Sequence, residues 1–355
     1  MDIEAQSWRM LSDAALPVIL GTMAATAGLI MVLFPLLRRY ALARPVARSS
    51  HKVPTPQGGG IAVIASTLVA LSWAAASIEG HALASDRHLL AVIAATVGLA
   101  VVGMTDDIRP MRAGPRLVLQ SFAVGIVVAT LPADLRIAPA FPFAIERAAV
   151  AFSLLWFVNL VNFMDGIDWM SVAEVTPVTA GLAILSTLGA LPPLGGLAAL
   201  ALCGAMLGFA PFNRPVARLF LGDVGSLPIG LVTGWMLVLL AGRGHPVAAL
   251  LLPLYYLADA TITLARRLAK GERLWEAHRT HFYQRALGNG FTVGQVSSQV
   301  FLANMALVVL AIATVVTPYP LVIALAFLAG AALVALLLIR FSHPRRTRDL
   351  ADRTS

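Results

Sequence analysis

Long apolar runs, each of the length that an α-helix needs to cross a bilayer, alternate along the chain with short polar connections. Several runs are rich in Gly and Ala, which favours close helix packing in lipid. The pattern predicts an all-α polytopic membrane protein of about 11 transmembrane helices. The expected spans are residues 15–37, 59–78, 88–104, 116–132, 147–163, 171–190, 194–211, 222–241, 246–265, 296–316 and 319–340.

Composition supports this membrane interpretation. Hydrophobic residues make up 59% of the chain and charged residues 12%, and the mean hydropathy is +0.82. Soluble domains carry about 25% charged residues, so a large soluble core is excluded. The first run is too long for a signal-peptide core and is expected to be retained. We expect one integral membrane domain over residues 1–355, with a motif core at 48–285 and a C-terminal cytoplasmic tail at 341–355.

The distribution of basic residues predicts the orientation of the chain. The net charge is +8, but no nucleic-acid-binding motif accompanies it. All but five of the 26 Lys and Arg residues fall on one side if the first connection is cytoplasmic. The positive-inside rule then places the N-terminus in the periplasm and the C-terminus in the cytoplasm. Every polar motif described below falls on the cytoplasmic side, so we expect a catalytic face that is open to cytosolic substrate.

The most polar motif follows the fifth apolar run. Asn159, Asn162, Asp165 and Asp168 recur at a spacing of three, which keeps them near one face of a helix and its following turn. Two carboxylates and two amides form an oxygen-rich surface that suits Mg²⁺ and the phosphate it carries. The alternative is structural, with the amides packing helices and the acids solvating a turn around Gly166.

Two further acidic motifs fall on the same side. Asp106 and Asp107 adjoin the third apolar run, and two adjacent carboxylates favour a shared cation or a proton between them. They could serve Mg²⁺ binding or general-base chemistry, or form a solvated helix end with Arg109 as counter-charge. Asp223, in the polar island 212–226, could bind a metal or simply cap the next helix.

Two basic segments complete the set. Residues 48–60 combine cations, hydroxyls and a glycine run, which fits an anionic substrate or a topology-setting loop. The loop 266–295 contains His278 and His281, which could donate to a diphosphate or clamp a metal. Zinc is disfavoured because no Cys or HExxH pattern accompanies them. Asp259 is a lone acid inside an apolar run that could pair with a motif residue or with a nearby Arg, and the sequence gives it no more specific role.

Together these motifs resemble the polyprenyl-phosphate N-acetylhexosamine-1-phosphate transferases. That family includes the bacterial enzymes that start O-antigen, enterobacterial-antigen and teichoic-acid synthesis, and the phospho-MurNAc-pentapeptide translocase. The matching segments, in family order, are His51-Lys-Val-Pro-Thr-Pro-Gln-Gly-Gly-Gly60, Asp106-Asp107, Asn159 to Asp168, Phe212-Asn213 with Phe220-Leu-Gly-Asp223-Val-Gly-Ser226, and His278-Arg-Thr-His281-Phe-Tyr-Gln284.

The resemblance implies that a UDP-activated sugar phosphate is transferred to polyprenyl phosphate, with release of UMP, at the bacterial inner membrane. It implies Mg²⁺, with Mn²⁺ as a substitute, and a homodimer. It also implies roles for individual residues. The metal ligands are Asp223 and Asn162; the catalytic acids are Asp106 and Asp107 at the lipid phosphate and Asp165 and Asp168 at the nucleotide and metal; the substrate-binding residues are His51, Lys52, Asn159, Asn213, His278, Arg279 and His281.

Two positions depart from the family pattern. Trp169 follows Asp168 where the family usually has Gly, which affects local geometry and sugar choice more than reaction type. The histidine motif reads His-Arg-Thr-His rather than three consecutive histidines, which favours the O-antigen or teichoic-acid branch. Two functions from other classes remain open: a flippase that binds the same lipid headgroup, and an inactive scaffold of a glycan assembly complex.

Overall fold

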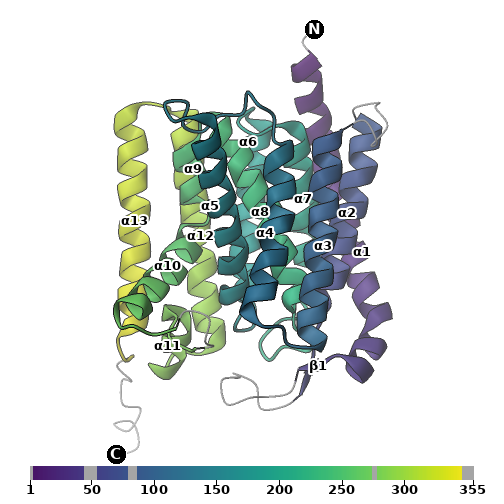
Figure 1. Cartoon of the computed structure of the whole chain (residues 1–355), viewed down its shortest axis with the longest axis vertical. Coiled ribbons are helices and arrows are strands. Elements are labelled where there is room, and N and C mark those ends of the chain that lie inside the picture. Colours follow the sequence, from purple (N-terminus) through teal and green to yellow (C-terminus); the bar gives the residue numbers. More distant parts are fainter. Residues whose placement is uncertain (1–2, 44–53, 79–85, 274–277, 346–355) are drawn as a thin grey trace, which may run out of the picture.

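The computed structural model describes residues 3–43, 54–78, 86–273 and 278–345. The described chain is an α-helical bundle with one short β-hairpin (Figure 1). In chain order the elements are α1 Ile3–Tyr40, β1 Leu42–Ala43, β2 Thr55–Pro56, α2 Gly59–Ile78, α3 Arg87–Ile108, α4 Ala113–Thr130, α5 Phe143–Met164, α6 Met170–Thr187, α7 Pro193–Phe209, α8 Asp223–Gly242, α9 Pro246–Leu251, α10 Leu254–Ala269, α11 Phe282–Gly288, α12 Val293–Val316 and α13 Pro320–Ser342.

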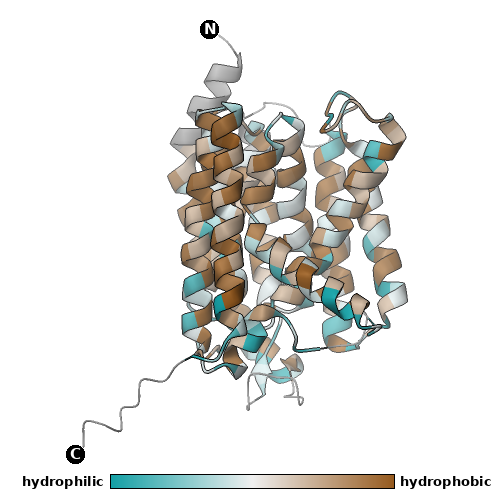
Figure 2. Cartoon of the chain, turned by 90° about the vertical axis from the view of Figure 1, so that its left-hand side faces the viewer, coloured by the Kyte–Doolittle hydropathy of each residue, from teal (hydrophilic) through white to brown (hydrophobic). Residues whose placement is uncertain are grey.

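The bundle has the apolar length of a multi-pass membrane protein. Within the described residues, 8 helices are long and apolar enough to cross a membrane. Two shorter apolar helices are Gly59–Trp73, which is most of α2, and Pro193–Phe209, which is α7. Hydrophobic residues dominate the helices, and hydrophilic ones gather toward their ends (Figure 2). The polytopic all-α class is therefore confirmed, whereas the count of eleven spans and the orientation stay predictions.

The expectation of one continuous helix over residues 246–265 is wrong. The chain forms α9, turns at Leu252 and Pro253, and continues as α10. Proline lacks the N–H that would donate to the preceding turn, and its ring clashes with the carbonyl four residues earlier. The break separates an upper segment from α10, which leads toward α11 and the histidine motif (Figure 1).

The short β-hairpin, which an all-α pattern does not predict, organises the glycine run. Beyond β2, Gln57 forms a parallel bridge with Phe220. Gly58 and Gly59 donate their backbone N–H groups to the Phe220 carbonyl, and Gly60 donates to Leu221. These N–H groups are therefore paired with the segment before α8, and the glycine run joins two motifs that lie far apart in sequence.

All the described motifs lie at one end of the bundle. This end, which we call the motif end, contains the C-terminal ends of α1, α3, α5, α7 and α13, the first turns of α2, α4, α6, α8 and α12, and α11 (Figure 1). The one-sided distribution expected from the sequence is thus present in the fold. Which side of the membrane it faces stays a prediction.

Glycines allow α2 and α3 to pack against the first turn of α8, which is almost entirely buried. A Cβ on Gly103 of α3 would lie 2.1 Å from the backbone oxygen of Asp223, and one on Gly60 would lie 2.2 Å from Cα of Gly225. No side chain fits at either position without moving backbone. The close approach brings Asp106 and Asp107, three and four residues beyond Gly103, beside Asp223.

We predict that Gly103→Ala separates α3 from α8 and lowers the stability of the protein by about 1–3 kcal/mol, as overpacking does. Gly98→Ala on the same helix is the matched control, because a Cβ there meets nothing within 4 Å. That control should be neutral or gain up to about 1 kcal/mol from helix propensity. Thermal unfolding in detergent compares the two. Equal melting temperatures would show that the α3–α8 contact does not need glycine.

Candidate functional site

The first turn of α8 is capped by a carboxylate from another helix. Asp107, in the last turn of α3, accepts from the backbone N–H of Asp223 at 3.0 Å and from that of Val224 at 3.1 Å. The first N–H groups of a helix have no partner within it, and its N-terminus favours negative charge. Gly222, at φ 77, makes the turn into the helix. Asp107 therefore fixes the start of α8, and the Asp223 side chain is left for other contacts.

Asp223 lies in a cluster with Asp106, Arg116 and Asn162. Arg116 donates to Asp106 at 2.8 Å and to Asp223 at 3.4 Å, and the Asn162 amide donates to Asp223 at 2.8 Å. The side chain of Asp223 is 27% exposed and that of Asp106 is 12% exposed. The cluster is thus partly shielded but open enough for a charged substrate to reach it.

The side chains of the cluster can be compared with the donors that Mg²⁺ binds in proteins. Asp106, Asp107 and Asp223 outnumber their one Arg partner, so the cluster has an excess of negative charge when the acids are ionised. Among the described residues, no three His, Cys, Asp or Glu side chains are placed to hold a metal together. Mg²⁺ commonly uses one or two carboxylates together with waters and substrate phosphates, so the donor set fits this mode. The Asn162 nitrogen faces Asp223, and a turned amide would present its oxygen instead.

The four polar side chains predicted to share one surface have different partners. Helix α5 ends at Met164, so only Asn159 and Asn162 lie on it. Asn162 reaches Asp223, whereas Asn159 donates to Gln120 of α4 and to the Leu155 carbonyl. The four side chains therefore have separate hydrogen-bond partners on different elements, and the single oxygen-rich surface stays a prediction.

The two acids of the following turn also have different hydrogen-bond partners. Asp165 accepts from Ser171 at 2.5 Å, and Asp168 is buried and accepts from the backbone N–H of Ala217 at 3.0 Å. Burial raises the pKa of the Asp165 carboxyl to about 7, and the charges of Asp107 and Asp168 act in the same direction, against the hydrogen bond from Ser171.

Trp169 occupies the conformation that the family glycine would adopt. Its φ of 63 is the only positive value at a non-glycine residue among those described. Its backbone N–H donates to the Asn213 oxygen and its indole N–H to the Ala210 carbonyl, both at 2.7 Å. Asn213 is buried and also donates to Leu219. These anchors hold a strained residue in place and tie the start of α6 to the loop after α7.

The histidine motif is organised by Asp259, the lone acid whose partner the sequence left open. Its fully buried carboxylate accepts from the backbone N–H groups of Phe282 and Tyr283 at 3.0 and 3.1 Å, and thereby caps α11. It also faces His281 Nδ1 at 3.2 Å, and Tyr255 and Thr263 complete its contacts. An ionised Asp259 fixes the imidazole proton on Nδ1, which leaves the opposite ring nitrogen for another partner.

The two histidines form a stack against the end of α5. The His278 and His281 ring centroids are 4.9 Å apart, and Tyr283 stacks on the other side of His281. Tyr283 donates to the Phe163 carbonyl at 3.0 Å and lies where a side chain on Gly166 would be. Burial lowers the pKa of His278 to about 4, helped by the charges of His281 and Arg267. His278 is therefore neutral at pH 7.

Of the three remaining predicted site residues, the structure describes one. His51 and Lys52 lie outside the described residues, and the side chain of Arg279 is exposed at the motif end. Two further residues hold the site together: Arg116, which sequence reasoning missed, and Asp259, for which it left the partner open. Arg116 follows Asp106 by ten residues across a helix connection, and Asp259 precedes its main-chain partners by more than twenty, so neither has a local sequence signal.

Fold and site together define a multi-pass membrane protein with acidic, cationic and imidazole groups gathered at one end, an arrangement suited to phosphate chemistry. A family model described as glycosyl transferase family 4 matches residues 89–241, which include the Asp106, Asn162 and Asp223 cluster. This match covers part of the chain, and together with the relatives below it supports a relationship to the polyprenyl-phosphate hexosamine-1-phosphate transferases.

Curated relatives of two kinds are similar to the chain. A probable undecaprenyl-phosphate N-acetylglucosaminyl 1-phosphate transferase of Bacillus subtilis is 23% identical over 74% of this chain and 75% of that protein. The decaprenyl-phosphate N-acetylglucosaminephosphotransferase of Mycolicibacterium smegmatis is 27% identical over 72% of this chain and 70% of that protein. The phospho-N-acetylmuramoyl-pentapeptide-transferase of Gluconacetobacter diazotrophicus is 30% identical, but over only 52% of this chain and 58% of that protein. Because both kinds match, the preference for the O-antigen or teichoic-acid branch stays a prediction.

We predict that Asp165→Asn increasingly stabilises the protein as the pH rises from 4 to 7. The ordinary pKa of the carboxyl is 3.8 and burial raises its pKa to about 7 in the folded protein, so the unfolded chain loses its proton first and wild-type stability falls over that range. Asn keeps an acceptor for Ser171 and does not titrate. Thermal unfolding with a chelator present measures the melting-temperature difference, which should level off above pH 7. A difference independent of pH would show that Asp165 titrates normally.

We predict that Asp259→Asn detaches α11 and the histidine motif. Each oxygen of Asp259 accepts from a backbone N–H, which can only donate. In either orientation the new amide N–H₂ therefore faces a backbone N–H and leaves that N–H unsatisfied, which costs about 1–3 kcal/mol of stability. Thr263→Val is the matched control, since it removes only the 3.4 Å contact to the same carboxylate. Thermal unfolding compares the variants, and a similar loss in both would refute Asp259 as the anchor.

Proposed function

We propose that the protein transfers an N-acetylhexosamine 1-phosphate from a UDP-activated donor to polyprenyl phosphate. The observation that carries this proposal is the cluster of Asp223, Asp106, Arg116 and Asn162 at the motif end of a chain that the family 4 model matches in part. An oxygen of the polyprenyl phosphate forms a new bond to the phosphorus that bears the sugar. The bond from that phosphorus to UMP breaks, and UMP leaves with the electron pair, so that polyprenyl-diphosphate-sugar remains.

The side chains present suit the charge that this reaction brings together. Arg116 offers a guanidinium beside Asp106 and Asp223, and Arg279 is exposed at the same end of the bundle. His278 contributes hydrogen bonds rather than charge, because it is neutral at pH 7. Positioning of the two phosphates therefore carries most of the proposed catalysis. An acceptor phosphate with a second pKa near 6 is already ionised at pH 7 and needs little help from a base.

Mg²⁺ is part of the proposal. Asp223 would hold it, with Asn162 after its amide turns, and Mn²⁺ is the expected substitute. When bound, the ion would neutralise phosphate charge and align the two substrates. Asp107 would keep its contact with the first turn of α8, and Asp106 would keep Arg116 oriented toward the phosphates.

The proposed setting is the bacterial inner membrane, with the motif end in the cytoplasm where UDP-sugars are found. The polyprenyl tail would lie between apolar helices, which explains why a phosphotransferase needs so much membrane-spanning structure. Such a reaction is the first membrane step of a cell-envelope polysaccharide. The sugar is left to experiment, and a homodimer stays a prediction.

The test is UMP release by the purified protein in detergent. The protein is incubated with undecaprenyl phosphate, Mg²⁺ and, one at a time, the UDP derivatives of GlcNAc, GalNAc, QuiNAc and FucNAc. Release that depends on both lipid and Mg²⁺ establishes the reaction and identifies the sugar. Lipid binding without UMP release from any donor, by protein that melts cooperatively, would favour a flippase or a scaffold instead.

We predict that Asp223→Asn lowers turnover by at least about 100-fold, the scale for losing one group that stabilises transition-state charge. The protein should still fold, because Asp107 rather than the Asp223 side chain caps α8. Asp86→Asn is the matched control: Asp86 caps α3 at the opposite end of the bundle, and Asn also caps helices. Near-normal turnover of Asp223→Asn would overturn the metal assignment.

A further inference from the structure

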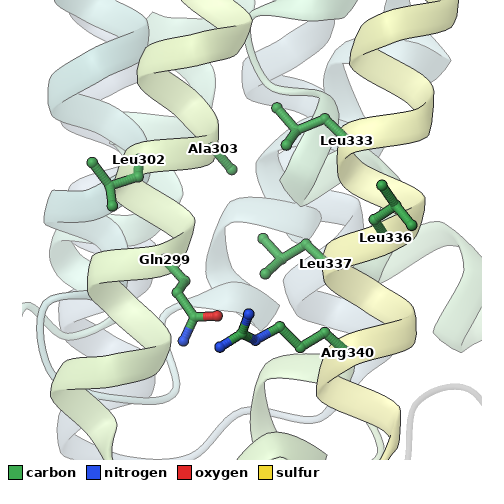
Figure 3. Close-up of a pocket in the computed structure, with 7 residues that line it drawn as sticks. All are labelled: Gln299, Leu302, Ala303, Leu333, Leu336, Leu337 and Arg340. Atoms are coloured by element: carbon green, nitrogen blue, oxygen red, sulfur yellow. The ribbon is translucent and has the colours of Figure 1, made fainter.

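Helices α12 and α13 enclose a groove that the proposed reaction does not use. The groove has a volume of about 280 Å³ and is lined by Gln299, Leu302, Ala303, Leu333, Leu336, Leu337 and Arg340. Its walls are aliphatic, and Figure 3 shows the amide of Gln299 and the guanidinium of Arg340 facing each other at one end. Leu302 and Leu336 are each 66% exposed, so the groove opens to the surroundings of the bundle.

The polar end of the groove has a positive charge without a compensating acid. The sequence contains no Asp or Glu between Glu276 and Asp349, so the hairpin of α12 and α13 is free of acids. Among the described residues, no carboxylate lies within ion-pair distance of Arg340. Its guanidinium lies 5.9 Å from the Phe291 ring centroid, and Arg345 donates to Gln295 nearby. A cation at the end of an apolar groove is complementary to an amphiphile with an anionic head.

The position of the groove identifies the kind of amphiphile. Arg340 is in the last turn of α13 at the motif end, where a membrane-spanning helix reaches the headgroup region. Helix α13 lies on the opposite side of the bundle from α3, whose last turn contributes to the Asp223 cluster (Figure 1). The volume equals that of about nine waters in the liquid, which is enough for a segment of an acyl chain but not for a whole lipid.

We propose that this groove binds an anionic phospholipid of the surrounding leaflet, with its phosphate on Arg340 and Gln299 and part of one acyl chain along Leu302, Leu333 and Leu336. This site is separate from the acceptor site of the proposed reaction. The bound lipid also contacts a junction of elements: Asn289, just after α11, donates to the Phe341 carbonyl at 2.7 Å and accepts from the Arg345 N–H at 2.8 Å. Occupancy therefore stabilises the connection between the histidine helix and α13.

The experiment compares phosphatidylglycerol with phosphatidylcholine of the same acyl chains, added to the purified full-length protein in detergent. Native mass spectrometry measures bound lipid, and thermal unfolding measures the stabilisation that bound ligand produces. We expect phosphatidylglycerol to bind more tightly and to raise the melting temperature. Arg340→Gln should weaken its binding about fivefold, the effect of removing one cation near a membrane surface.

Two further variants decide the interpretation. Arg39→Gln removes an exposed cation from α1 at the motif end but away from the groove, and it should bind lipid as the wild type does. Leu336→Trp fills the groove while it keeps Arg340, and it should also weaken binding. Equal weakening by Arg340→Gln and Arg39→Gln would show only general charge attraction. Binding of phosphatidylcholine as tight as that of phosphatidylglycerol, or full binding by both groove variants, would overturn the proposal.

Discussion

The carboxylate of Asp107 at the first turn of α8 is the contact on which the rest of the motif end depends. A helix buried as deeply as α8 cannot leave its first N–H groups without partners, because water does not reach them. Asp107 satisfies two of them from the last turn of α3, and the negative charge matches the positive end of the helix. The glycines that let α2 and α3 approach are needed because this bond forms only at close backbone distance.

The two adjacent acids, Asp106 and Asp107, have different contacts as a result. Both oxygens of Asp107 accept main-chain hydrogen bonds, whereas Asp106 accepts from the Met111 N–H and from Arg116. Two neighbouring carboxylates repel each other less when each has its own donors. Neither is left as a free base, which agrees with a reaction in which an already ionised acceptor phosphate has to be placed rather than deprotonated. Asp223 is left as the carboxylate with the greatest exposure in the cluster.

Sequence patterns predicted the helical class, most of the helices and the one-sided distribution of motifs, because apolar length and charge are properties of local sequence. They failed where an outcome depends on which elements meet. The spacing of three placed Asp165 and Asp168 in the turn after the helix of Asn162, but it could not predict that their partners are Ser171 and the Ala217 N–H. The partner of Asp259 was left open because the donors that surround it come from α11 as well as from its own helix. Trp169 was recognised as unusual, and its positive φ shows why glycine suits that position.

Charge balance then limits how the motif end can handle two phosphorylated molecules. The stacked histidines were expected to help hold a diphosphate, yet burial and neighbouring positive charge keep His278 neutral at pH 7. Near the acids, Arg116 already interacts with Asp106 and Asp223. Two anionic substrates brought to a cluster with an excess of carboxylates would repel it unless further positive charge arrives with them. The proposed divalent cation, bound together with the substrate phosphates, would meet this requirement, and it would use the accessible Asp223 while Asp107 keeps its contact with the first turn of α8.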